Sequence, residues 1–306
     1  MAGIAQRWRE LSGENNWEGL LDPLDIDLRR YIIHYGERTE AVANAYNGEK
    51  VSNWCRFSRY PPNKFFFEVG LQSGNPFKYK VTSFFYARSE IKLGSWIFAE
   101  ESSWMGYVAV ATDEGKALQI YLENPHHDAK ILSEVRKLVD KYQDEEISIT
   151  VTGHSLVMAF GSPRVGNEDF KKAVSQIKDL HILRIRNASD GITSLPPDLF
   201  SYVDVGQQLA IDTNKSPYLL PGVNPHNLEI YLHGVAGTQG LFGEFELVIH
   251  RCRSLVNKHL KALNPELTPN VPEQWWIEKN KDMVQQDDGS WELDDYVPPP
   301  PSTTTA

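Results

Sequence analysis

Segments with helical periodicity alternate with apolar, strand-like runs through the middle of this chain, and this alternation narrows the choice of fold more than any other feature. Residues 131–142 place apolar side chains on one helical face, and residues 146–153 form a run rich in β-branched side chains. A short apolar run at 157–162, a helix at 167–177 and a strand at 181–187 follow. Helices alternating with near-continuous apolar strands indicate an α/β domain with a mostly parallel sheet and helices on both faces.

The segments on either side of this region add further elements. A 3.6-residue apolar stripe predicts a helix over 27–47, and β-rich runs predict strands at 78–87 and 104–113. A late helix is expected from about 242 to 263. Asn167 is the expected N-cap of the helix that it opens, because acidic residues follow it in the first turn.

No internal repeat is visible, so we expect one folding unit with extensions. Residues 1–88 are interpreted as an N-terminal helical and irregular region that packs on the core, and residues 89–261 as a shortened α/β core. Residues 262–306 are interpreted as a C-terminal extension whose four consecutive prolines and Ser/Thr end predict a disordered tail.

Charge and cysteine content exclude several classes of protein. The chain of 306 residues carries 31 Lys+Arg against 41 Asp+Glu, a formal charge of −10, which argues against nucleic-acid binding through phosphates. Two cysteines, Cys55 and Cys252, cannot build a disulfide framework. Residues 1–21 are interrupted by charges every few positions, unlike a signal peptide, and no run reaches the ~18 apolar residues of a membrane span. We therefore expect a cytoplasmic protein without a transmembrane segment.

The strand at 146–153 ends in a segment that matches part of a hydrolase motif. In α/β hydrolases a nucleophilic serine sits on a tight turn between strand and helix, and the next backbone N–H stabilises the oxyanion. Gly153 and Ser155 fit this pattern, and the N–H of Leu156 is the corresponding oxyanion donor. Val157 stands where the motif has glycine. An ordinary turn serine is the alternative for Ser155.

Partners for this serine occur downstream in the hydrolase order of serine, aspartate and histidine. Asp190 follows the strand at 181–187, where a carboxylate can orient an imidazole, and His226 lies in a later loop. His233 is the rival candidate for the acid and base. The other candidates are interpreted as turn, surface or misplaced residues: Asp198, Asp204, Asp212 and His181.

Several longer blocks occur in one order along the chain: WRELSGENNWEGLLDPLDIDLRRYIIHYGE, ISITVTGHSL, FGSPRVGNEDF, LRIRNASDGITSLPP, HNLEIYLHGVAGTQG and NKDMVQQDDGSWEL. Together they resemble the plant class 3 lipase family, specifically its cytosolic phospholipase A1 type II group. The resemblance implies an α/β-hydrolase fold and hydrolysis of sn-1 acyl esters of glycerolipids, with Ser155 as nucleophile, Asp190 as orienting carboxylate and His226 as acid and base. It implies a phospholipid, galactolipid or acylglycerol substrate, a membrane or lipid-droplet surface, and no cofactor.

Two internal segments of that family pattern are missing. GHSL is followed in the family by a glycine and an alanine-rich helix, whereas here Leu156 leads directly into VMAFGSPRVG. A strand and loop with a W-R-G-T motif, which supplies the second oxyanion donor, is also absent, and only LQIYLENPHHDAK stands in its place. The losses predict an incomplete sheet, a hairpin turn at GHSL between ITVT and VMAF, and weakened or absent catalysis. They suggest a shortened transcript, and the alternative function is an inactive homologue that binds lipid or protein.

Other clusters have simpler interpretations. His126, His127 and Asp128 are adjacent and cannot easily converge on one ion, so we expect a solvated loop and no metal site. A metal role for His226 with His233 is set aside in favour of the serine and aspartate partners. The aromatic clusters at 65–67, 84–86 and 96–98 are expected in the core, with acyl-chain or lipid binding as the alternative.

Overall fold

We describe the protein from a computed structural model. The residues described are 2–48, 55–72, 78–87, 103–111, 117–122, 129–144, 148–153, 158–240, 242–276, 283–285 and 291–293.

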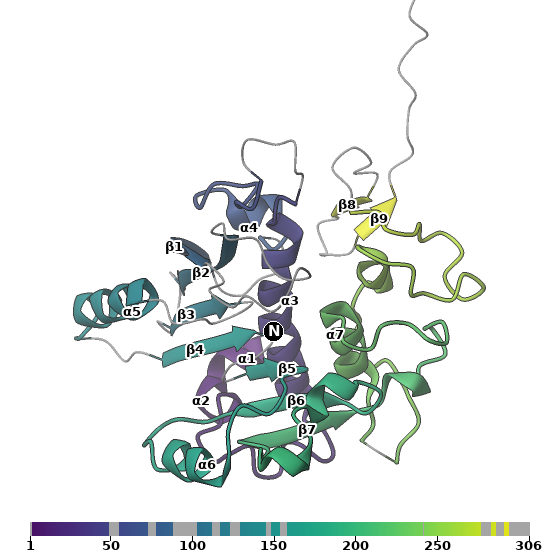
Figure 1. The fold of residues 1–306 in the computed structure, drawn as a ribbon. Helices are drawn as coiled ribbons and strands as arrows, with labels where there is room; N and C mark the ends of the chain where they lie inside the picture. The colour runs from purple at the N-terminus through teal and green to yellow at the C-terminus, as the bar shows by residue number, and fades with distance from the viewer. Residues whose placement is uncertain are drawn as a thin grey trace, which may run out of the picture.

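Seven strands form one continuous sheet whose spatial order follows the chain (Figure 1). They are β1 (Tyr79–Ala87), β2 (Ser103–Ala111), β3 (Ala117–Leu122), β4 (Ser148–Gly153), β5 (Met158–Phe160), β6 (Leu183–Asn187) and β7 (Gln207–Ile211). The first three strands pair antiparallel, and β3 through β7 pair parallel. The predicted α/β fold with a mostly parallel sheet is confirmed.

Four longer helices surround this sheet: α3 (Ile26–Ala45), α5 (Ala129–Lys141), α6 (Glu168–Ser175) and α7 (Leu228–Gly237). Asn167 caps α6 as expected, because its side chain accepts a hydrogen bond from the backbone N–H of Phe170 at 3.0 Å. The short helices are α1 (Ala2–Gln6), α2 (Trp8–Leu11) and α4 (Phe65–Glu68), with 3₁₀ turns η2 (Gly191–Ser194), η3 (Asp198–Phe200), η4 (Thr213–Lys215) and η5 (Arg253–Asn257). A separate hairpin joins β8 (Met283–Gln285) and β9 (Trp291–Leu293).

Both faces of the sheet are covered, as the alternation of side chains along β2 demonstrates. Tyr107 and Ala109 belong to the main core, which also contains the buried face of α3, whereas Val108 and Val110 pack with Leu138 of α5. Since alternate residues of a strand point to opposite faces, α3 and α5 lie on opposite sides of the sheet. Figure 1 shows α3 running across the strands with α7 beside it. None of the described helices is long and apolar enough to cross a membrane.

The expected helix at 242–263 is wrong. Within this range the only helical element among the described residues is η5, and residues 244–250 run past the end of α7 with alternating exposed and partly buried side chains. The backbone N–H groups of Glu246 and Val248 donate to carbonyls at the end of α7, and Leu247 and Ile249 alternate onto the main core. The packing of Leu247 and Ile249 on the core and the backbone bonds to α7 therefore outweigh the helix propensity of this segment, because propensity is weak compared with tertiary packing.

The expected hairpin at GHSL is also wrong, because β4 and β5 are parallel, with Thr152 opposite Met158 and Gly153 opposite Ala159. The helical crossover through α5 sets the direction of β4, and the crossover through α6 makes β5 parallel to β6. Only residues 154–157 connect β4 to β5, although parallel neighbours usually need a dozen or more. A strand missing from the sheet was expected to leave its neighbours re-paired or with exposed edges, and the described strands are paired without a break, since β3 pairs with both β2 and β4.

The aromatic clusters are mostly in the core, as expected. Phe65 and Phe66 are buried and contact Tyr107 through their rings, and Phe85 is buried on the α5 side. Phe67 is the exception, with 68% of its surface exposed. The cluster at 96–98 lies outside the described residues.

Candidate active site

The candidate site lies at the carboxyl edge of the parallel strands. Asp190 follows β6 by three residues and caps η2, accepting the backbone N–H of Ile192 at 3.0 Å. Ser155 follows β4 by two residues, and β4, β5 and β6 are parallel, so both segments leave the sheet at the same edge. Ser155 and Leu156 themselves lie outside the described residues.

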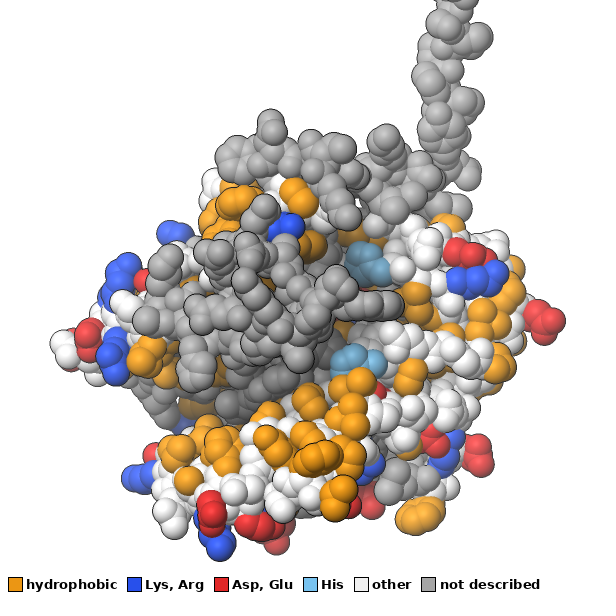
Figure 2. Space-filling view, in the orientation of Figure 1, with side chains coloured by type: hydrophobic (Ala, Val, Ile, Leu, Met, Phe, Trp, Pro, Cys, Tyr) orange, Lys and Arg blue, Asp and Glu red, His pale blue; other side chains and the backbone are white. Residues whose placement is uncertain are grey.

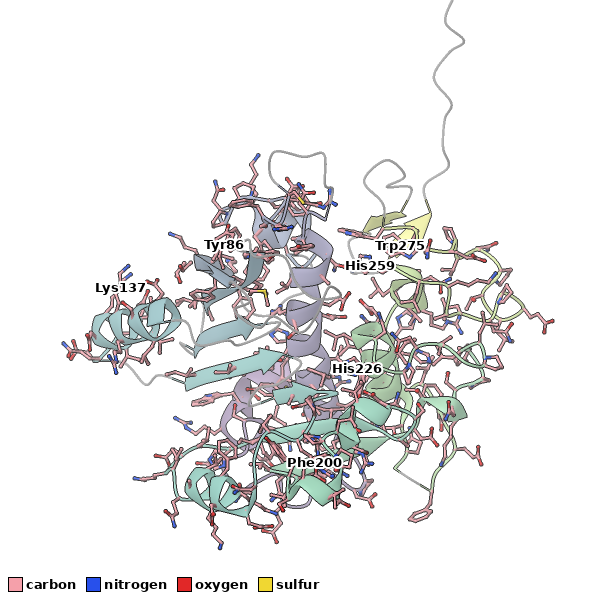
Figure 3. All side chains as sticks on the ribbon, viewed as in Figure 1. Tyr86, Lys137, Phe200, His226, His259 and Trp275 are labelled. Carbon is pink, nitrogen blue, oxygen red and sulfur yellow. The ribbon has the colours of Figure 1, made fainter. Side chains whose placement is uncertain are left out.

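Asp190 and His226 form a hydrogen-bonded pair at this edge. The Nδ1 of His226 lies 2.7 Å from Oδ2 of Asp190. The aspartate side chain is 1% exposed and the histidine side chain 33%, so the carboxylate is buried behind an imidazole that reaches the surface. A proton on Nδ1 in this bond leaves the lone pair of the imidazole on Nε2. Figure 3 shows His226 between the edge of the sheet and the start of α7.

Tyr231 is a second donor to the same carboxylate. Its hydroxyl donates to Oδ2 of Asp190 at 2.6 Å and accepts the backbone N–H of Asn187 at 3.3 Å. Burial, together with the Asp190 carboxylate, raises the pKa of Tyr231 well above its usual range, so the phenol remains a donor. One oxygen of Asp190 is thus held by two side chains from the His226 loop and α7.

The loop that carries His226 is held to the sheet by Asn187, the last residue of β6. Its Nδ2 donates to the Thr213 hydroxyl at 2.8 Å and to the Pro225 carbonyl at 3.2 Å, and its Oδ1 accepts the Thr213 N–H. Asn187 is fully buried. Because one amide connects β6, η4 and the residue before His226, it positions the imidazole relative to the strand that leads to Asp190.

Gly161, which follows β5, lies against the imidazole. Its φ is +63°, a conformation that favours glycine. A Cβ at this position would lie 3.1 Å from Nδ1 and Cε1 of His226 and 3.1 Å from the Tyr231 hydroxyl. The missing side chain therefore lets the ring pack directly on the backbone.

A buried ion-pair cluster anchors α7 to α3. Arg251 is paired with Glu37 of α3 at 3.0 Å and with Glu229 of α7, and its side chain is 6% exposed. Buried charges such as these persist only when they are paired. The cluster fixes the first turn of the helix that carries Tyr231.

The rival histidine, His233, lies elsewhere in α7. It is buried, its Nε2 lies 2.7 Å from the Ser216 hydroxyl, and its ring stacks on Phe245. Burial, with help from Arg251 and Arg253, lowers the pKa of His233 to about 3. Its hydrogen bond leads away from Asp190, so the carboxylate is joined to His226 and not to its rival.

The remaining candidates have structural partners. Asp204 pairs with Arg184 and Arg164, Asp198 pairs with Arg164, and Asp212 caps η4. His181 lies 3.2 Å from the side-chain oxygen of Asn16. The part of the chain that the structure describes contains no group of three or more His, Cys, Asp or Glu suited to a metal ion. The His126–Asp128 cluster lies outside that part.

Three residues of the site were not anticipated from the sequence: Tyr231, Asn187 and Gly161. Tyr231 lies five positions after His226 on an apolar helix, where it reads as core. Asn187 had a usable signal, because a polar amide ends an otherwise apolar strand just before the Asp190 loop. Gly161 had no signal apart from its residue type.

Comparison with known proteins gives a consistent set of relatives. The family described as Lipase (class 3) matches residues 157–200. Phospholipase A1-IIbeta of Arabidopsis thaliana is 37% identical, with 95% of this chain and 94% of the relative covered. Phospholipase A1-II 1 of Oryza sativa subsp. indica is 38% identical, with 97% and 98% covered.

The first of these alignments spans 391 positions, whereas this chain has 306 residues, so the relative carries long segments that have no counterpart here. Among solved structures, a lipase from Rhizopus microsporus var. chinensis is 14% identical with a TM-score of 0.39. That likeness covers 64% of this chain and 78% of the lipase chain.

Proposed function

This chain belongs to the plant phospholipase A1-II family of class 3 lipases, and on that basis we propose that it hydrolyses sn-1 acyl esters of glycerolipids. The observation that carries the proposal is the pair of Asp190 and His226 at the edge where the segment with Ser155 leaves the sheet. The substrate class is a phospholipid, galactolipid or acylglycerol. No cofactor takes part in the proposed reaction.

The proposed chemistry follows from the tautomer that Asp190 favours. With the Nδ1 proton of His226 directed at the carboxylate, Nε2 takes the proton of the Ser155 hydroxyl as the oxygen attacks the ester carbonyl. The backbone N–H of Leu156 donates to the oxyanion. When the tetrahedral intermediate collapses, the imidazolium returns the proton to the leaving lysolipid oxygen, and water then releases the fatty acid by the same steps in reverse.

Active-site labelling tests this proposal. A fluorophosphonate probe should label the wild-type chain and not Ser155→Ala, and His226→Gln should lose labelling whereas His233→Gln should keep it. Phosphatidylcholine with a different acyl chain at each position should release the sn-1 chain. Absence of labelling in a sample with native near-UV circular dichroism would sink the proposal.

One observation favours a second candidate, an inactive homologue that binds lipid. Only four residues, 154–157, separate the end of β4 from the start of β5, and two of them follow Ser155 in the sequence. Such a chain would bind lipid vesicles without labelling or fatty-acid release. The cytoplasmic location expected from the sequence stays part of the proposal, and a fluorescent fusion that enters the secretory pathway would contradict it.

A further inference from the structure

The segment between β6 and β7 exposes an unusual amount of apolar surface. Leu199 is 87% exposed and Phe200 62%, in a turn that also exposes neighbouring aliphatic and aromatic side chains. We call this set the apolar loop surface: Val165, Ile192, Leu195, Leu199, Phe200 and Tyr202. Val165 belongs to it because the adjoining backbone pairs with the loop, Arg164 N–H to the Leu195 carbonyl at 2.7 Å and Gly166 opposite Val203.

Carbonyls and hydroxyls of the same loop bind arginines that lie beneath it, and Asp198 is the exposed polar exception. Arg164 donates to the carbonyls of Pro196 at 3.1 Å and Ser194 at 3.4 Å. Arg184, which is buried, donates to the Thr193 carbonyl and pairs with Asp204. Surface loops usually turn polar groups to water and apolar side chains to the core. Here the arrangement is reversed, which suits a loop that meets an apolar medium.

Arg186 completes the support of the loop from within the sheet. It donates to the hydroxyl of Thr193 at 3.2 Å and to that of Ser194 at 3.1 Å. Three arginines therefore brace the turn between Asp190 and Tyr202, and the exposed side chains are held by their own loop in a fixed position. A braced loop can insert apolar groups without first losing conformational entropy.

The apolar loop surface is continuous with the candidate active site. Its first turn, η2, is capped by Asp190, whose carboxylate also binds His226. Figure 3 labels Phe200 below His226, and Figure 2 shows hydrophobic side chains gathered over that same region of the face. A lipid aggregate that covers this surface would lie beside the imidazole of His226. An aggregate that supplies the substrate must take that position.

We propose that the apolar loop surface docks the protein on a zwitterionic phospholipid surface, with Leu199 and Phe200 inserted among the lipids. The proposal rests on the proposed function, because the substrate is taken from the lipid that is docked. A zwitterionic surface is favoured over an anionic one, since the chain carries a formal charge of −10 and the exposed Asp198 lies within the loop. The arginines beneath the loop donate to its carbonyls and hydroxyls and are engaged there.

Cosedimentation with phosphatidylcholine vesicles tests the docking. The full chain should bind, and the double variant Leu199→Ser/Phe200→Ser should bind at least about tenfold more weakly, because two inserted apolar side chains are lost. Phe242→Ser is the matched control, since its side chain is 99% exposed outside the apolar loop surface, and it should bind like the wild type. Near-UV circular dichroism checks that all three proteins are folded.

Other outcomes overturn the proposal. Equal binding of the double variant and the wild type would do so, and so would binding that requires added phosphatidylglycerol. A wild type that dimerises in gel filtration, with a monomeric double variant and no vesicle binding by either, would assign the surface to a second copy. Vesicle binding through the loop without fluorophosphonate labelling would refute the proposed catalysis and leave docking intact, so the two failures are distinguishable.

Discussion

The two sides of the candidate active site are built differently. On the side of Asp190, β6 and β7 are paired over five residues from Leu183 to Asn187. On the side of Ser155, β4 and β5 are paired only at Thr152 and Gly153, and four residues join them. The strand that leads to Asp190 is therefore paired along its whole length, while the strand that leads to Ser155 is paired with β5 at two residues.

This difference shows that the pair of Asp190 and His226 is held by elements outside the connection that carries Ser155. Asp190, His226 and Tyr231 are joined through β6, the loop before α7 and α7 itself, all of them C-terminal to the shortened region. The buried carboxylate–imidazole pair is therefore present although long segments of the relatives have no counterpart in this chain.

On the Asp190 side of the site, the largest expected effect on activity comes from removing the charge of that carboxylate. Asp190→Asn should lower kcat on a soluble ester by a factor on the order of 10⁴, because an amide no longer holds the reactive tautomer of His226. Asp212→Asn, which alters only the cap of η4, is the control and should stay within about twofold. Asp190→Asn with more than a tenth of wild-type kcat would show that the pair is not used.

Breaking the anchor of α7 should be the largest effect on stability. Arg251→Met removes the hydrogen-bonded partner of Glu37 and of the fully buried Glu229, leaving Lys258 as the nearby positive charge, and should lower the free energy of unfolding by about 3–5 kcal/mol. Lys261→Met removes an ion pair with Glu273 whose side chains are more than half exposed, and should cost less than about 1 kcal/mol. Urea unfolding measures both, and equal losses would contradict the assigned role of the cluster.

Acid should lower the free energy of unfolding because His233 of α7 is buried in its neutral form. Its pKa falls from the ordinary 6.5 to about 3 on folding, so the unfolded chain binds more protons between these values. Stability is therefore complete above pH 6.5 and declines as pH falls toward 3, by on the order of 2 kcal/mol between pH 7 and pH 4.5. His233→Gln should flatten this decline in urea unfolding series. An unchanged pH slope in the variant would disprove the contribution.

A substitution where the two sides meet should have a smaller effect. Gly161→Ala introduces a Cβ 3.1 Å from His226 at a φ of +63° and should cost about 1–2 kcal/mol of stability together with activity. Gly222→Ala has a similar φ of +77° and open space around it, so it should lose stability alone. Matching losses of kcat in the two variants would mean that the imidazole is not displaced.

Loss of the second donor to Asp190 should be the mildest of these changes. Tyr231→Phe leaves the His226 bond in place, and we expect about 1 kcal/mol less transition-state stabilisation, or roughly fivefold in kcat. The change should appear in kcat with little change in KM, because Tyr231 acts through the carboxylate. A variant that loses only stability would assign the tyrosine a structural role.

Many of the helices and strands could be predicted from local sequence patterns. The helix stripe that became α3, the β-branched runs of β1 and β4 and the cap at Asn167 are decided by neighbouring residues. The prediction of a helix at 242–263 was wrong because part of this segment forms backbone hydrogen bonds with the end of α7. No local sequence pattern indicates such a contact. The predicted antiparallel direction of β5 was wrong for a similar reason. The helical crossovers before β4 and after β5 set the strand directions, and the length of the four-residue connection between them did not.

The residue types of the candidate site, and their order as Ser155, Asp190 and His226, are properties of the chain alone, because motif spacing and strand ends can be read in one dimension. The sequence favoured His226 with His233 as its rival, and the three-dimensional structure decided between them, because one imidazole lies against the Asp190 carboxylate and the other against Ser216. Tyr231, Gly161 and the exposed loop at Leu199 also came from the three-dimensional structure. Burial and hydrogen-bond partners arise from segments far apart in sequence, and only folding brings them together.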